Sequence, residues 1–440
     1  MSAKRILVFG ASGLIGQFVA ADLERRGHRV VAVARRFSPA QRARFGADGR
    51  ELPIAALGSS EIADLLRASN AEVVVNCLGV LQDEPGSRMC DVHGRFVDRL
   101  IAALRDVGSG ILLVHVSVPG AEADDRTAFS LTKRKAERQI VEAYPHAVVL
   151  RPGFVFAPAA YGGSALLRAL AASPFELPRV ERERPFAYVA VEDLAETVAW
   201  AAEAWAPGKP GGARIWDVMH PHPCRVGDVV DALRGWLGIS ARAHAAVPGF
   251  LLAAIARMGD LAGWLGWRPP IRSTALAEMR RGVAGNPAEW RAATGIEPMS
   301  LEAVLRSRPA TVQDKWFAAL YGLKPLVIAV LAAFWSVSGA IALAAFAPAA
   351  AILTAHGWSD QMARIATITS SLMDLAVGLA IAVRPTCRAG LITGIAVSVF
   401  YMMGAAVLTP DLWGEPLGAL VKTGPAIVLM LVALATLEAR

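Results

Sequence analysis

The chain has 440 residues, of which 54% are hydrophobic and 19% are charged, and its formal net charge is +7. This length exceeds that of one compact domain, so we expect two or three domains. The charged residues concentrate before residue 320, whereas residues 325–437 carry very few. Because the sequence has no basic stripe with interleaved aromatic side chains, we expect no nucleic-acid partner. Arginines near an anionic lipid surface and a phosphate-bearing ligand explain the positive charge more simply.

The cysteines and histidines favour neither a disulfide framework nor a metal site. Cysteines occur at positions 77, 90, 224 and 387 without any C-x-x-C pair. His220 and His222 alternate with prolines and have no third ligand nearby, whereas zinc needs three or four. The first strand pattern begins at about residue 4 without a preceding signal-peptide core, so we expect a cytosolic N-terminal domain.

Residues 1–155 alternate between strand and helix patterns. The predicted strands are 5–9, 29–34, 52–57, 71–79, 110–117 and 147–150, and the predicted helices are 14–26, 60–68, 91–106 and 127–143. Such alternation predicts an α/β fold, a Rossmann-type doubly wound parallel sheet covered on both faces. Residues 151–240 are mixed, with a strand expected at 216–218 and a helix at 226–237. We therefore expect a dinucleotide-binding domain over 1–240 that includes a small substrate-side subdomain.

A glycine-rich turn joins the first strand to the first helix. It reads Gly10-Ala-Ser-Gly13-Leu-Ile-Gly16. Glycines allow a tight turn and close approach to a pyrophosphate, and the helix N-terminus offers free N–H groups. The turn predicts a dinucleotide site that includes Gly10, Ser12, Gly13, Leu14, Ile15 and Gly16.

An arginine pair follows the second strand. In this fold, residues at that position bind the ribose of the adenosine half of the cofactor. An acidic residue there would favour NAD, but the chain has Arg35 and Arg36. Two guanidinium groups are suited to the 2′-phosphate of NADP, so we expect NADP(H) over NAD(H). The alternative is an ordinary pair of solvated loop arginines.

The C-terminal part carries four long apolar segments, at about 325–350, 364–383, 388–408 and 416–437. Each reaches roughly the 20 residues that a bilayer core requires, so we expect an all-α transmembrane four-helix bundle over 324–440. Buried core helices are the alternative. Residues 241–323 are expected to form a helical connector, possibly on the membrane surface, where Trp264 and Trp267 dip into lipid or cover the adjacent domain.

Charged residues between the spans predict the orientation. Basic residues lie before the first span, between the second and third, and at the end of the chain: Lys315, Lys324, Arg384, Arg388 and Arg440. The opposite loops contain Asp360, Arg364, Asp411 and Glu415. The positive-inside rule therefore predicts a multi-pass protein of the inner (cytoplasmic) membrane with both termini cytoplasmic.

Several short motifs occur along the chain in the same order as in a known protein family. They are the glycine turn, Asn76-Cys-Leu-Gly79, Val116-Ser117, Lys133 with Ala136-Glu137, Leu150–Pro158 and Phe186–Ala195. Residues 4–305 resemble the atypical short-chain dehydrogenase/reductase superfamily, and within it the branch of the complex I NADPH-binding accessory subunit and coenzyme Q proteins. The tail resembles the DoxX-like membrane family, with Trp335-Ser-Val-Ser-Gly339 as its clearest mark.

The resemblance implies further site residues. Leu78, Gly79, Ser117, Lys133, Pro152 and Phe154 would line the cofactor, and Lys133 and Ser117 would belong to the catalytic group. Active relatives use Tyr-x-x-x-Lys, but Phe129 replaces the tyrosine that serves as general acid/base. Ser130 projects in another direction, Tyr144 has the wrong spacing, and Tyr161 and Tyr188 approach only from later loops.

Three functions remain open. The first is an NADPH-dependent oxidoreductase or epimerase-like enzyme acting on a lipid-soluble, quinone- or isoprenoid-like substrate. The second is a non-catalytic NADPH-binding accessory or assembly protein of a respiratory or quinone-biosynthetic membrane complex. In the third, the membrane domain itself passes a small solute. Asp374 inside the second span is either a proton or quinol-headgroup contact or a structural hydrogen-bond partner of Ser370, Ser371 or a neighbouring span.

Overall fold

The computed structural model describes residues 3–437 except 82, 84–87, 109, 207–211, 241–244 and 415–419. The chain divides into two compact units. The first unit comprises Met1–Met258 and Pro270–Ala318, and the second comprises Gly259–Pro269 and Ala319–Arg440. We describe each unit by itself.

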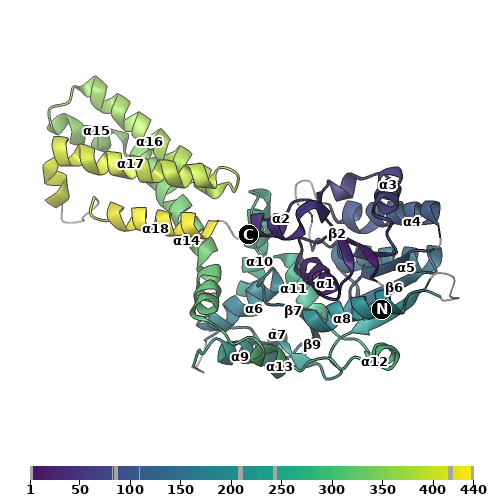
Figure 1. Cartoon of the computed structure of the whole chain (residues 1–440). Helices are drawn as coiled ribbons and strands as arrows, with labels where there is room; N and C mark the ends of the chain where they lie inside the picture. The colour runs from purple at the N-terminus through teal and green to yellow at the C-terminus, as the bar shows by residue number, and fades with distance from the viewer. Residues whose placement is uncertain are drawn as a thin grey trace. The chain divides into compact units, whose positions relative to one another are not determined.

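The first unit is built on a seven-stranded sheet in which every neighbouring pair is parallel (Figure 1). Its strand order is β11-β6-β5-β4-β1-β2-β3. The strands are β1 (Arg5–Phe9), β2 (Arg29–Ala34), β3 (Gly49–Glu51), β4 (Val73–Asn76), β5 (Leu112–Val116), β6 (Ala147–Pro152) and β11 (Arg214–Val218). The order reverses between β1 and β4, which creates the crevice where ligands bind in this class of fold. The predicted Rossmann-type fold is confirmed.

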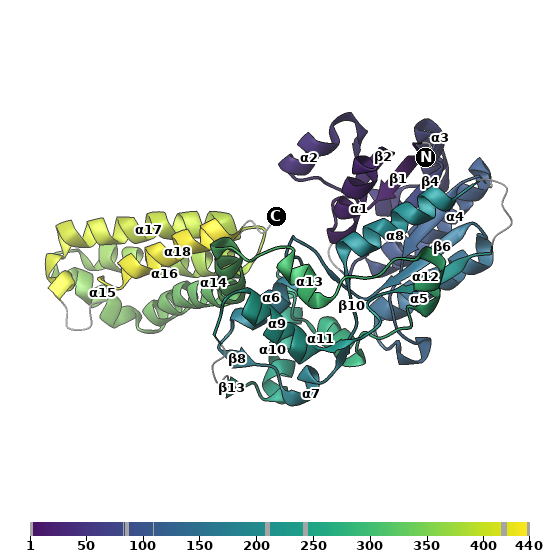
Figure 2. The same cartoon turned by 60° about the horizontal axis from the view of Figure 1, so that its bottom comes forward.

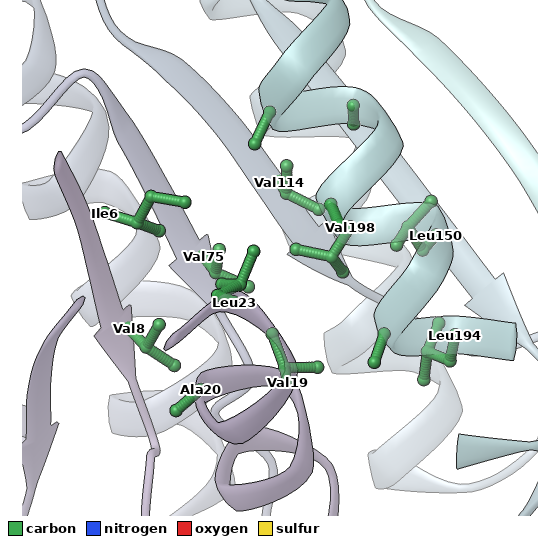
Figure 3. Close-up of a cluster of buried hydrophobic side chains, with 14 of the residues drawn as sticks. Ile6, Val8, Val19, Ala20, Leu23, Val75, Val114, Leu150, Leu194 and Val198 are labelled. Atoms are coloured by element: carbon green, nitrogen blue, oxygen red, sulfur yellow. The ribbon is translucent and has the colours of Figure 1, made fainter. Parts of the chain in front are cut away.

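Helices cover both faces of this sheet. Helices α1 (Leu14–Arg25) and α8 (Val191–Ala204) pack on one face, and α3 (Ser59–Ser69), α4 (Phe96–Val107) and α5 (Ala128–Ala143) pack on the other. Figure 3 shows Val19 and Leu23 of α1 and Val198 of α8 directed toward the strand residues between them. These side chains are fully buried, and each contributes roughly 1.5–3 kcal/mol of transfer free energy.

Two predicted elements differ from the structure. The strand expected at 52–57 is wrong, because β3 ends at Glu51 and Ile54–Ala56 forms a 3-10 turn. Pro53 lacks the amide that would continue the ladder. The helix expected at 91–106 begins instead with a π-helical segment, Cys90–Arg95, which leads into α4. This segment buries both Val92 and His93.

A smaller substrate-side region belongs to the same unit. Its strand pairs are β7 (Phe154–Phe156) with β10 (Tyr188–Ala190), β9 (Pro185–Phe186) with β12 (Cys224–Arg225), and β8 (Phe175–Glu176) with β13 (Ala245–Ala246). Its helices include α6 (Gly163–Ala172), α7 (Arg179–Arg182), α9 (Val226–Trp236), α11 (Ser273–Arg281), α12 (Ala288–Thr294) and α13 (Leu301–Arg306), of which α6, α9 and α11 gather together in Figure 2. Trp290 of α12 is fully buried and donates to Thr197 of α8, so residues beyond 270 complete this unit.

The second unit is a bundle of apolar helices (Figure 1). Its elements are α14 (Val312–Ala344), whose first residues belong to the first unit, α15 (Phe346–Ala355), α16 (Asp360–Ala382), α17 (Cys387–Leu408) and α18 (Thr423–Leu437). Within the described residues, α14, α16 and α17 are long and apolar enough to cross a membrane. The fourth predicted span, 416–437, corresponds to α18, whose 15 residues extend about 22 Å, less than a bilayer core of about 30 Å. Residues 415–419 lie outside the described part.

Candidate functional site

The glycine turn lies at the carboxyl end of β1, and each of its glycines has a steric reason. Gly10 has φ +81°, and a Cβ there would lie 3.1 Å from the backbone of Cys77. A Cβ on Gly16 would collide with the carbonyl oxygen of Gly10. Gly13 is the N-cap of α1, and its amide donates to the Gly10 carbonyl over 2.9 Å. The turn is therefore tight because the side chains that would open it are absent.

The start of α1 is suited to an anion. Leu14, Ile15 and Gly16 form the first turn of the helix, whose amides have no carbonyl one turn earlier to bond. No side chain caps this end, and the first turn contains no acidic residue. The half-buried Ser12 adjoins it, and its carbonyl accepts from Gln41 of α2 (Pro39–Phe45). Three such amides at the positive end of a helix dipole are suited to binding a phosphate group.

Arg35 and Arg36 follow β2 and are both exposed. Neither forms an ion pair in the part of the chain that the structure describes. The sequence interpretation did not consider Glu51, which pairs in register with Ala34. Its carboxylate already accepts from Phe37 and Arg42, each over 2.8 Å, and the Arg42 hydrogen bond lowers its pKa. Both of these hydrogen bonds use the same carboxyl oxygen of Glu51, whereas the two exposed arginines are available to a ligand.

Lys133 lies on α5 beneath the turns that follow β4 and β5. Its ammonium donates to the carbonyls of Leu78, over 2.7 Å, and Val116, over 2.8 Å. A Cβ on Gly79 would lie 3.7 Å from this ammonium. Burial lowers the pKa of Lys133 to about 8, because its partners are carbonyls rather than carboxylates. Two of its three N–H groups are used, which leaves one for a ligand.

Phe129 is one helical turn before Lys133 and meets His93 edge to face, with ring centroids 5.7 Å apart. His93 accepts from the Val80 amide through Nε2, and its Nδ1 lies 2.9 Å from the Thr132 hydroxyl. Burial lowers the pKa of His93 to about 2, so this imidazole is neutral and fully engaged. No sequence spacing indicated His93, because it reaches the site from a π-helical segment 36 residues before Phe129.

The other hydroxyl groups considered from the sequence are engaged elsewhere. Ser130 shares a hydrogen bond with Thr127, the N-cap of α5, over 3.0 Å. Tyr144 donates to the Ile111 carbonyl, at the amino end of β5, and the buried Tyr188 hydroxyl accepts from the Leu301 amide. Tyr161 is 40% exposed. None of these replaces the missing tyrosine one turn before Lys133.

Ser117 and Pro152 follow neighbouring strands. The Ser117 amide donates to the Leu150 carbonyl over 2.7 Å, and both side chains are buried. The Ser117 hydroxyl helps to lower the pKa of Glu137 but makes no hydrogen bond of normal geometry. Phe154 is half-buried in β7 and packs on Phe186, with centroids 4.7 Å apart.

A buried ion network beneath Ser117 was not foreseen. Arg134 pairs with Asp125 over 3.1 Å and with Glu137 over 3.2 Å, and Arg281 of α11 pairs with Asp125 over 2.8 Å. Arg151 at the end of β6 also pairs with Glu137. Arg134 and Glu137 are three residues apart on α5, but Arg281 reaches Asp125 from a distant part of the sequence, so local spacing does not indicate the whole network. Among the described residues, no group of three metal-ligating side chains is present.

Family models match both parts of the chain. Residues 6–216 match the NAD dependent epimerase/dehydratase family, and residues 332–431 match the DoxX-like family. The NADH dehydrogenase [ubiquinone] 1 alpha subcomplex subunit 9, mitochondrial, of Arabidopsis thaliana is 24% identical over 147 residues, which are 33% of this chain. The match spans only 37% of that protein.

Solved structures of similar fold include two bacterial enzymes. UDP-glucose 4-epimerase of Thermotoga maritima, solved with UDP-glucose, has a TM-score of 0.51 at 16% identity, covering 73% of this chain and 99% of its own. WbmG of Bordetella bronchiseptica, solved with NAD and UDP, has a TM-score of 0.50 at 12% identity, covering 73% and 97%. At these identities the likeness shows the fold alone. The expected resemblance to a dehydrogenase/reductase-like domain followed by a DoxX-like domain is confirmed.

Proposed function

We propose that this chain, in which an NAD-dependent epimerase/dehydratase-type domain precedes a DoxX-like domain, is a membrane-anchored protein that binds NADP(H) in preference to NAD(H). The single observation that carries the proposal is the uncapped, acid-free N-terminus of α1 behind a turn in which Gly10 has a positive φ and Gly16 leaves no room for a side chain. Its amides would hold the cofactor diphosphate.

The preference for NADP(H) rests on Arg35 and Arg36. Both are exposed at the end of β2, and the neighbouring carboxylate of Glu51 is held by Arg42 and the Phe37 amide. A 2′-phosphate would gain two guanidinium partners, which an unmodified ribose has no charge to attract.

The nicotinamide half would lie over Lys133. Its remaining N–H would donate to a ribose hydroxyl, while Ser117 and Gly79 would border the ring. The reduced nicotinamide supplies a hydride when it is bound. This chain provides no tyrosine to move the accompanying proton, because Phe129 and a fully bonded His93 occupy that place.

We therefore favour a nucleotide-binding accessory protein, for which bound NADPH is a stabilising ligand, in a respiratory or quinone-biosynthetic membrane complex. The relative in Arabidopsis is by its name a subunit of an NADH dehydrogenase, which supports this choice. The bundle of apolar helices would be the part that docks in the inner membrane.

A second function is favoured by Lys133. Burial brings the pKa of its ammonium to about 8, within the range of useful general acids at neutral pH. In a reductase, hydride would pass to the carbonyl carbon of a lipid-soluble, quinone- or isoprenoid-like substrate. Lys133 would then give a proton to the carbonyl oxygen, leaving NADP⁺ and the alcohol or quinol.

The orientation with both termini cytoplasmic stays a proposal. Lys324 and Arg384 both donate to the Leu437 carbonyl, so these two basic residues lie at one end of the bundle. His356 pairs with Asp411, which joins the two loops expected on the opposite side. Glu415 and Arg440, used for the same prediction, lie outside the described residues.

The test is calorimetric titration of the full chain in detergent with NADPH, NADP⁺, NADH and NAD⁺. We expect NADPH to bind at least about tenfold more tightly than NADH, which corresponds to about 1.4 kcal/mol. Arg35→Ala with Arg36→Ala should remove the difference, whereas Arg29→Ala, at the other end of β2, should preserve it. The absence of binding heat with every dinucleotide would overturn the proposal.

Turnover distinguishes the two functions. The accessory protein should gain thermal stability from NADPH without consuming it, and should co-purify from native membranes with a stable complex. The reductase should oxidise NADPH with a member of a quinone and enone panel, and Lys133→Met should abolish that reaction.

A further inference from the structure

Helix α10 (Gly249–Trp264) has two apolar faces, of which the protein covers only one. On the covered face, Leu252 is 7% exposed and Ala256 is 1% exposed. Both belong to the hydrophobic cluster that includes Leu237, Leu301 and Val304. The helix is therefore held by ordinary core packing along this face.

The other face is apolar and open. Large hydrophobic side chains follow it along the whole helix and the next residue: Phe250, Leu251, Ile255, Met258, Leu261, Trp264 and Leu265. Trp264 is 87% exposed and Phe250 is 78% exposed. These positions repeat at three- and four-residue intervals, so they form one continuous stripe. A stripe of this extent on a soluble surface is unfavourable and indicates an apolar partner.

The C-terminal end of α10 is hydrogen-bonded to the bundle at the turn between α16 and α17. The Leu265 carbonyl accepts from the Arg384 amide over 2.9 Å, and the Trp267 indole donates to the Ala382 carbonyl over 2.7 Å. Gly266, with φ +84°, packs against Pro385. These partners form the turn between α16 and α17.

That turn has to lie at a membrane surface. It connects two helices that are long enough to cross a bilayer, and its backbone groups outside the helices require water or headgroups. Arg384 also stacks over Trp267, with its guanidinium carbon 5.6 Å from the ring centroid, and tryptophan is typical of this boundary. The C-terminal end of α10 is thus placed where lipid and water meet.

We propose that α10 is an interfacial helix whose open stripe is immersed in the lipid bilayer. The occupant is the acyl-chain region of the same membrane that α14, α16 and α17 cross, because the end of α10 is bonded to the α16–α17 turn. Arg257 is exposed and lies on the same face as Phe250 and Trp264, so its long side chain would have to extend its guanidinium from the stripe to the headgroups. The chain then contacts lipid in two ways, through the spanning helices and through the open stripe of α10.

The test is photocrosslinking of the full chain in native membranes. Met258 and, in a separate variant, Leu261 are replaced with p-benzoylphenylalanine, which forms a carbon–carbon bond with a nearby C–H group on irradiation. Both positions are more than half exposed, so the replacement leaves the core unchanged. Ile392 of α17, which is 52% exposed, is the positive control for lipid. Leu131 of α5 is an equally exposed hydrophobic control outside the stripe.

We expect phospholipid adducts, identified by peptide mass, at Met258, Leu261 and Ile392 and none at Leu131. Adducts at Ile392 without adducts at either α10 position would overturn the proposal. Crosslinks from both α10 positions to another polypeptide, or to a second copy of this chain, would also overturn it and would assign the stripe to a protein interface. The outcome does not depend on dinucleotide binding, so this proposal and the proposed function fail separately.

Discussion

The phenyl ring of Phe129 meets the imidazole of His93 edge to face, one helical turn before Lys133. His93 cannot take over the role of a proton donor there, because the Val80 amide and the Thr132 hydroxyl engage both of its nitrogens. The place where related enzymes hold an acid is therefore filled by a hydrocarbon ring against a neutral imidazole. In the function proposed above, dinucleotide binding is therefore separable from catalysis.

Phe129→Tyr should create turnover. The new hydroxyl would stand one turn before the Lys133 ammonium, whose charge favours the phenolate and makes the tyrosine a better acid. With a quinone or enone acceptor, we expect the rate of NADPH oxidation to rise about 100-fold or more. This rate is measured as the loss of reduced-nicotinamide absorbance. Phe129→Leu is the matched control and should stay inactive. If the tyrosine variant binds NADPH but oxidises it no faster than the parent, the assigned nicotinamide position is wrong.

Lys133 should make stability depend on pH above neutrality. Its pKa is about 8 in the folded state against 10.5 in an unfolded chain, because burial disfavours the ammonium. The cost of burying the charged ammonium lowers the free energy of unfolding fully below pH 8. This cost decreases between pH 8 and 10.5 and is absent above pH 10.5. The unfolding free energy of the parent should therefore rise relative to Lys133→Met by about 3 kcal/mol across this window. Parallel thermal unfolding curves of the two proteins throughout the window would contradict this.

The parts of the fold that sequence predicts best are those encoded locally. Continuous apolar strands and glycine spacing indicated β1, α1 and β2 with nearly correct bounds, because parallel strands are buried on both faces. The weak strand at 52–57 was misplaced since apolar character outweighed the missing amide of Pro53. A local pattern also does not show that α18 is short.

Much of the site depends on contacts between distant residues. Lys133 and Phe129 share a motif and were found, but His93 and the Arg281–Asp125 ion pair were not, because these residues reach the site from distant parts of the sequence. Likewise, the register of β2 with β3 places Glu51 beside the arginine pair. Lipid contact of Trp264 was one alternative from the sequence, but the sequence did not show which residues of α10 form the open face, because apolar residues lie on both faces of this helix.

Gly16→Ala should lower the stability of the first unit even without a bound ligand. The added methyl group would overlap the Gly10 carbonyl, so α1 must shift away from the turn. We expect a loss of about 1–3 kcal/mol of unfolding free energy, together with loss of NADPH binding. Gly235→Ala in α9 is the control, because a Cβ there meets nothing within 4 Å and alanine is the better helix former. Equal stability of the two variants would show that the close approach is not required.

The His356–Asp411 pair should stabilise the bundle only at acidic to neutral pH. The Ile352 carbonyl and the Asp411 carboxylate both accept from the imidazole and raise the pKa of His356 above its usual 6.5. The contribution is therefore complete below pH 6.5 and is lost as pH rises through the higher folded-state value. Asp411→Asn should lower the melting temperature at about pH 6 and have little effect at about pH 9. A constant difference over this range would mean that the pair does not titrate as described.

Asp374 should matter for the packing of α14, α16 and α17 through its hydrogen bonds. Ser338 donates to one carboxyl oxygen over 3.3 Å, and Tyr401 donates to the other over 3.1 Å. In Asp374→Asn, the side-chain carbonyl still accepts a hydrogen bond from one hydroxyl, and the new NH2 group can donate to the oxygen of the other after that hydroxyl rotates. We therefore expect little change in thermal stability. Asp374→Leu removes the acceptor of the Ser338 hydroxyl and leaves the Tyr401 hydroxyl only the Ser370 carbonyl, 3.4 Å away, so we expect a loss of about 1–2 kcal/mol.

The hydroxyl groups provide the control for this last prediction. Adding Ser338→Ala and Tyr401→Phe to Asp374→Leu removes both hydroxyl donors, and it should recover much of the lost stability, because replacing all partners by apolar groups is nearly neutral. Recovery, measured as the melting temperature of the full chain in detergent, would assign Asp374 a structural role. If Asp374→Asn keeps its melting temperature but an NADPH-linked reaction disappears, the carboxyl group acts chemically and the structural account fails.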